Sequence, residues 1–156
     1  PADLAEVTAG TDVVATKLTL GGDGWYEAAR QHLGHLAVFV PGHHLATGVK
    51  EGVAAGSFSN VACLSPHGAQ RWTALMATDL DALEIETRIR AFITDSILPY
   101  ATAGYSNAAL DKLLAAIGGW ADVGTRLRGP YRSIDPADAL PLRRAAIALI
   151  PEIMRP

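Results

Sequence analysis

The sequence is poor in cysteine, in aromatic residues and in basic or long apolar runs. Its one cysteine, Cys63, excludes an internal disulfide and is typical of a reducing compartment. The formal net charge of −3 and the lack of a basic run argue against an electrostatically driven nucleic-acid partner. No apolar run is long enough to span a bilayer, and we recognise no signal peptide, so we expect a cytoplasmic protein with no membrane partner.

What is present indicates a globular protein. Hydrophobic residues make up 49% of the 156 residues and charged residues 19%. That balance is typical of a folded chain, and the length suffices for one domain with a real core.

The first part of the chain alternates between apolar strands and short helices. We predict strands near 12–19, 36–41 and 53–60, separated by helices over 25–33 and 43–50. Short helical crossovers of this kind join parallel strands in right-handed units. We therefore predict three adjacent parallel strands in chain order.

After Asn60 the pattern becomes helical. Caps and proline positions predict where these helices begin and end. The expected segments run from Ser65 to about Thr78, from Asp81 to Leu98 with Pro99 as its end, from Asn107 to Ile117 with Ser106 as N-cap, and from Asp135 onward with breaks at Pro141 and Pro151. An ordered loop is expected over Trp120–Arg132.

The first predicted strand carries a lysine in an apolar setting. Strand side chains alternate between faces, so Lys17 and Thr19 share one face with Val13 and Ala15. Burial disfavours a charged amine, and a neutral amine is a nucleophile. Lys17 is therefore a candidate nucleophile, although a lysine at a strand end that keeps its amine in water is the other interpretation.

Four stretches, taken in order, resemble the dihydrodipicolinate synthase and N-acetylneuraminate lyase family. The stretch from Val13 to Thr19, Val-Val-Ala-Thr-Lys-Leu-Thr, is similar to the sixth barrel strand, which carries the Schiff-base lysine. Val-Phe-Val-Pro-Gly, ending at Gly42, is similar to the seventh strand. Ala55–Pro66 resembles the eighth strand and the entry to its helix, and Gly104–Arg128 resembles the C-terminal helical extension.

The resemblance implies an α/β fold, namely the C-terminal part of a (β/α)8 TIM barrel followed by a helical region. We expect residues 1–64 to form the partial barrel with the lysine strand, and 65–156 to form the last barrel helix and the extension. The family's first five strands have no counterpart here. Its carboxylate-binding turn and catalytic tyrosine are therefore missing, and Tyr26 and Tyr105 do not take that tyrosine's place.

By resemblance, the function is that of a Schiff-base lyase acting on pyruvate or a related 2-oxo acid, with Lys17 as nucleophile. Thr19, Gly42 and Ser57 would contact the substrate, although ordinary turn chemistry also accounts for Gly42 and Ser57. No metal or organic cofactor is implied. We expect a homo-oligomer, a tetramer by resemblance, and a partnership with the missing barrel half, without which this fragment would be inactive. The alternative is a non-catalytic half-barrel that serves binding or assembly.

Several other residues are candidates for function. His43 and His44 depart from the acidic residues often found after the family's glycine, and a zinc site with His32 and His35 is a weaker hypothesis. Arginines around Gly129-Pro130 suit either an anion pocket or, as we favour, the binding of helix-terminal carbonyls; they are Arg126, Arg128 and Arg132. Cys63 is interpreted as a small buried residue. A phosphate-binding loop at Gly21–Gly24 ranks last, because its glycine spacing is wrong.

Overall fold

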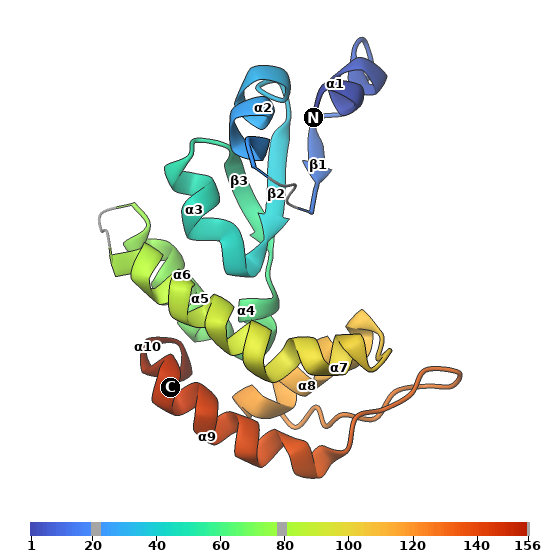
Figure 1. Ribbon diagram of the computed structural model, residues 1–156, viewed down its shortest axis with the longest axis vertical. Coiled ribbons are helices and arrows are strands. Elements are labelled where there is room, and N and C mark those ends of the chain that lie inside the picture. The colour runs from blue at the N-terminus through green and yellow to red at the C-terminus, as the bar shows by residue number, and fades with distance from the viewer. Residues whose placement is uncertain (20–22, 78–80, 156) are drawn as a thin grey trace. The chain divides into compact units, whose positions relative to one another are not determined.

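The computed structural model describes residues 1–19, 23–77 and 81–155. It divides into two compact units, Pro1–Ser59 and Asn60–Pro156 (Figure 1). The first contains the sheet and the second is helical. The expected roles of segments 1–64 and 65–156, a partial barrel and a helical extension, stay predictions.

The first unit contains a three-stranded parallel sheet. Its strands are β1 (Ala15–Lys17), β2 (Ala37–Pro41) and β3 (Ala54–Phe58), in the order β1-β2-β3. The helix α2 (Trp25–His32) connects the first pair, and η1 (Gly42–His44) with α3 (Leu45–Lys50) connects the second. A short helix, α1 (Ala2–Thr8), precedes β1. The predicted parallel order is confirmed.

One face of the sheet is buried beneath α3. Val38 and Val40 of β2 are 2% and 0% exposed, while Phe39 between them is half-buried on the other face. The helix approaches closely because Gly48 has no side chain. A Cβ there would lie 2.7 Å from the Cβ of Ala54 and 3.4 Å from Val40 Cγ2. This packing leaves the Phe39 face free of α3.

The strand β1 is shorter and more exposed than expected. It covers three residues, and the preceding Val14 is 76% exposed. The apolar residues near 12–19 suggest a buried strand, and this unit does not bury it. The physical reason is position, because within the described residues β1 pairs with β2 alone and so forms an edge of the sheet.

The second unit consists of packed helices and one long connection. The segment over residues 119–135 contains no regular element, as expected. A short helix occupies Asn60–Leu64, between the predicted end of the third strand near residue 60 and the helix predicted from Ser65. The helical elements are α4 (Asn60–Leu64), α5 (Pro66–Leu75), α6 (Asp81–Phe92), η2 (Ile93–Ile97), α7 (Leu98–Thr102), α8 (Asn107–Gly118), η3 (Pro136–Asp138), α9 (Ala139–Leu149) and α10 (Pro151–Met154).

The serine caps are confirmed. Ser65 Oγ accepts a hydrogen bond from Gly68 N at 3.1 Å, and Ser106 Oγ accepts one from Ala109 N at 3.3 Å. Trp72 of α5 lies in the core of this unit, where its Nε1 donates to the carbonyl of Ala82 at 2.9 Å. Among the described residues, no helix has the length and apolar character needed to cross a membrane.

Two expected proline breaks are wrong. Pro99 does not end the helical path, because it lies in the first turn of α7, after a π-helical turn at Ile93–Ile97. Pro141 lies in the first turn of α9. First-turn residues need no N–H for the helix, so proline is tolerated there. The break at Pro151 is confirmed, since it starts α10 after α9 has ended.

Candidate functional site

Lys17 is the last residue of β1, at the carboxyl end of the strand. In the sheet register it lies beside Phe39 of β2. Its side chain is exposed, and Nζ lies 5.2 Å from the ring centroid of Phe58 at the end of β3. The amine thus reaches over β2 toward the third strand, within cation–π distance of an aromatic face.

Two aromatic rings form the floor next to this amine. The rings of Phe39 and Phe58 meet edge to face, with centroids 5.6 Å apart. Gly56, the register partner of Phe39, leaves room for its ring, since a Cβ there would lie 2.9 Å from Phe39 Cε1. Phe58 is 60% exposed. The lysine therefore lies over an apolar surface open on its outer side in this unit.

The other expected site residues also lie near the carboxyl ends of the strands. Gly42 directly follows β2 and is buried at the start of η1. Thr19 is exposed two residues after β1, and the neighbouring Leu18 N still donates to Phe39 O at 3.0 Å. Active sites of parallel α/β folds are built at this edge. The roles of Thr19 and Gly42 stay predictions.

The register separates Ser57 from the lysine. Val38 pairs with Ala54 but Phe39 pairs with Gly56, so the ladder shifts by one residue in β3. Ser57 then pairs with Val40, and successive strand residues alternate between faces. Ser57 therefore shares the face of Val40, opposite the Lys17 and Phe39 face. Its role in binding substrate stays a prediction.

Sequence reasoning missed Phe39 and Phe58. The signal was present in His-Leu-Ala-Val-Phe-Val, where Leu36, Val38 and Val40 alternate with Ala37 and Phe39. Leu36, Val38 and Val40 form the buried face, so Phe39 lies on the opposite face. Phe39 pairs with Lys17 in the sheet register and therefore shares its face. Phe58 was harder to assign, because the one-residue shift in β3 changes which face it occupies.

The histidines and the cysteine have structural surroundings. The rings of His43 and His44 lie 4.5 Å apart, and His35 Nε2 shares a hydrogen bond of 3.1 Å with Thr8 Oγ1. Across residues 1–19, 23–77 and 81–155, no three His, Cys, Asp or Glu side chains gather as a metal site. Cys63 is half-buried rather than fully buried, so its interpretation as a small buried residue holds only in part. Burial, and secondarily the charge of Asp111, raises the pKa of its thiol.

Two arginines of the second unit bind helix-terminal carbonyls. Arg132 Nη2 donates to Ala103 O at 2.6 Å, and its guanidinium lies 4.0 Å from the Tyr105 ring centroid. Arg143 Nη1 donates to Ile117 O at 2.7 Å and also to Gly118 O. The carbonyl-binding interpretation is confirmed for Arg132. Of the expected loop glycines, Gly21 and Gly22 lie outside the described residues, and Gly24 precedes α2 with a φ of 77°.

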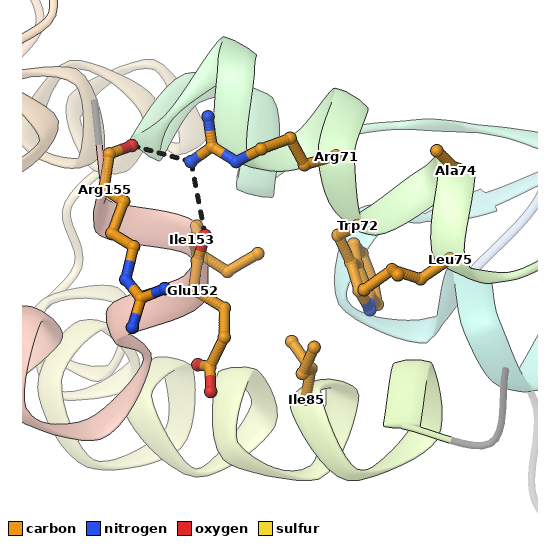
Figure 2. Close-up of a pocket in the computed structure, with 8 residues that line it drawn as sticks. All are labelled: Arg71, Trp72, Ala74, Leu75, Ile85, Glu152, Ile153 and Arg155. Atoms are coloured by element: carbon orange, nitrogen blue, oxygen red, sulfur yellow. Dashed lines mark hydrogen bonds between the residues drawn. The ribbon is translucent and has the colours of Figure 1, made fainter.

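A cavity of about 570 Å³ lies among α5, α6 and α10 (Figure 2). Trp72, Leu75 and Ile85 supply apolar walls. Arg71 Nη2 donates to the carbonyls of Glu152 and Arg155, at 3.3 and 2.7 Å. These polar contacts join α5 to α10, so we assign them to the stability of the helical unit.

The fold defines an α/β class in which parallel strands are joined by helical crossovers and followed by a helical unit. The solved structure of a dihydrodipicolinate synthase from Agrobacterium tumefaciens str. C58 is similar to this chain, with a TM-score of 0.62 at 20% sequence identity. The match covers 95% of this chain and 47% of that chain, so this chain spans about half the length of its structural relative. The sheet and helices thus match part of a TIM-barrel protein. No family model and no curated protein matches the sequence.

Proposed function

We propose that this chain is the C-terminal part of a Schiff-base lyase of the dihydrodipicolinate synthase type, with Lys17 as the nucleophile. Its substrate would be pyruvate or a related 2-oxo acid. The observation that carries the proposal is the position of Lys17 at the carboxyl end of a parallel strand, 5.2 Å from the Phe58 ring. The fold similarity to a dihydrodipicolinate synthase supports the same assignment.

The chemistry follows from the amine. The neutral amine of Lys17 adds to the ketone carbon of the 2-oxo acid, and loss of water leaves an imine, which takes up one proton. The imine withdraws electrons, so a proton leaves the neighbouring carbon and an enamine forms. That carbon then makes a carbon–carbon bond, and the reverse sequence breaks one. The lysine itself supplies the electron sink, so the proposal invokes no metal or organic cofactor.

The surroundings of Lys17 support a role for another segment of protein. A neutral amine needs a site sheltered from water, yet the Lys17 side chain is exposed in this unit. The aromatic floor of Phe39 and Phe58 covers it from one side only. We infer that further strands, supplied by the missing barrel half, enclose the site. Assembly as a cytoplasmic homo-oligomer, a tetramer by resemblance, belongs to the same proposal.

Turnover of 2-oxo acids by the completed barrel tests the function. The assay compares wild type with Lys17→Arg, which keeps the positive charge but forms no imine, and with the control Lys50→Arg on α3. We expect Lys17→Arg to lose turnover while its circular dichroism spectrum stays unchanged, and Lys50→Arg to keep both. Wild-type turnover by Lys17→Arg would overturn the proposal.

The exposure of Lys17 also favours a second candidate, a non-catalytic half-barrel that serves binding or assembly. Under this alternative the lysine is a solvated strand-end residue over Phe58. The two candidates differ in one result. The non-catalytic protein would show no imine with any 2-oxo acid, even when the remaining barrel strands are present.

A further inference from the structure

A basic hollow lies at the surface of the second unit. It has a volume of about 480 Å³ and is lined by Lys112 of α8 and by residues 126–129. Residues 126–129 belong to the connection that leads from α8 to α9, whose course Figure 1 shows. Three of the lining side chains are cationic, namely Lys112, Arg126 and Arg128, and the remaining two residues are Leu127 and Gly129. The described lining contains no acidic side chain.

Among the described residues, the three cationic side chains make no polar contact with the rest of the unit. Within the part of the chain that the structure describes, Lys112, Arg126 and Arg128 make no side-chain hydrogen bond or ion pair. The neighbouring Arg132 and Arg143 differ, because each binds helix-terminal carbonyls. Three like charges around one hollow repel one another, and they are concentrated here although the net charge of the chain is negative.

The loop that carries the two arginines is held in place on both sides. Before Arg126, the buried Thr125 donates its hydroxyl to Ile134 O at 2.7 Å. Between Arg126 and Arg128, the N–H of Leu127 donates to Ser133 Oγ at 2.8 Å. The backbone of the hollow is therefore organised before a ligand arrives, which lowers the entropic cost of binding.

We propose that this hollow binds the phosphate group of a small phosphorylated compound. A phosphate carries nearly two negative charges and several strong acceptor oxygens, and two guanidinium forks and one ammonium match that charge and geometry. A single carboxylate would leave more of the positive charge uncompensated. This site lies wholly in the unit Asn60–Pro156 and does not depend on the lyase proposal.

Inorganic phosphate is the probe for the test, titrated into the full chain while amide chemical shifts are recorded. We expect saturable shifts at Leu127 and Gly129, and affinity that falls as sodium chloride is raised. The double variant Arg126→Gln/Arg128→Gln should bind about tenfold more weakly or worse, because it loses two charge-assisted contacts. Arg144→Gln on α9 removes one exposed arginine outside the hollow and should bind as wild type does.

Three outcomes would overturn the proposal. The first is the absence of saturable chemical-shift changes at phosphate concentrations of about 20 mM. The others are an equal loss of phosphate affinity in Arg144→Gln, and tighter binding of acetate or citrate than of phosphate at matched ionic strength. If the double variant loses its fold, Lys112→Gln takes its place, with weaker phosphate binding expected and unchanged binding contradicting the proposal. Lys17→Arg should leave phosphate binding unchanged, so failure of one proposal is distinguishable from failure of the other.

Discussion

The contact between α4 and α8 gives a sharp test of the helical unit, through Gly118→Ala. A Cβ at Gly118 would overlap the carbonyl oxygen of Leu64 and lie 2.8 Å from its carbonyl carbon and 2.9 Å from Trp120 Cδ1. Real Cβ atoms essentially never approach below 3.0 Å, and the opposing atoms are mostly backbone. The two helices would have to separate, although Leu64 and Leu113 are 1% and 0% exposed between the packed elements.

The magnitude of this effect combines two opposing terms. Overpacking typically costs about 1–3 kcal/mol, and a clash with backbone atoms lies at the upper end of that range, whereas alanine in place of glycine in a helix gains about 1 kcal/mol. We therefore expect Gly118→Ala to lower the free energy of unfolding by about 2 kcal/mol.

Urea unfolding followed by circular dichroism provides the measurement, with Gly129→Ala as the matched control. Gly129 lies in the same unit, no atom lies within 4 Å of the place that an alanine methyl would take, and its φ is outside the left-handed region. This control should leave the free energy of unfolding unchanged or raise it by up to about 1 kcal/mol, because alanine restricts the unfolded chain more than glycine does. A Gly118→Ala protein as stable as wild type would refute the reasoning about the α4 and α8 contact.

Two pH-dependent predictions concern the same unit. The hydrogen bonds from Arg88 lower the pKa of Glu152. The stabilisation from this pair is therefore fully present above the ordinary glutamate pKa and is lost as the pH falls through the lowered pKa. In urea titrations Glu152→Gln should reduce this loss of stability in acid by at most about 1 kcal/mol, because the Glu152 side chain is 40% exposed. A variant with the same acid slope as wild type would contradict this. Burial, with the hydrogen bond to Asp138, raises the pKa of Tyr100 to about 12. The neutral form of Tyr100 thus contributes stability that is fully present below the ordinary tyrosine pKa and is lost as the pH rises through about 12. In an absorbance titration, wild type should show a tyrosine that ionises near pH 12, and Tyr100→Phe should lack it.

Rules that use only neighbouring residues, such as strand and helix alternation and helix capping, predict much of the architecture. The strand and helix alternation predicts the parallel order, and Ser65 and Ser106 predict two helix starts. The prolines show the limit of such rules. By local rules Pro99 and Pro141 are stops, yet each lies in the first turn of a helix, and the π-helical turn before Pro99 has no signature in the residue pattern.

The site is only partly predictable, because its geometry depends on pairing between strands. Lys17 is identifiable from its own strand, but the nearby Phe58 is 41 residues away in sequence and reaches the lysine through the fold. The one-residue shift between Val38 and Phe39 sets the face of Ser57, and no local pattern encodes it. The sequence also does not separate Arg132, which binds a carbonyl, from the cations that line the basic hollow.

Chemical trapping at Lys17 tests the central claim most directly. The completed barrel is incubated with pyruvate and sodium borohydride, which reduces an imine to a stable secondary amine, and the adduct is located by mass spectrometry of peptides. The chain offers two internal comparisons, since Lys50 and Lys112 lie on the helices α3 and α8. Our account predicts a pyruvate-dependent adduct on Lys17 alone, and its absence from Lys17→Arg. An adduct confined to Lys50 or Lys112, or no adduct on Lys17 under saturating pyruvate, would contradict it.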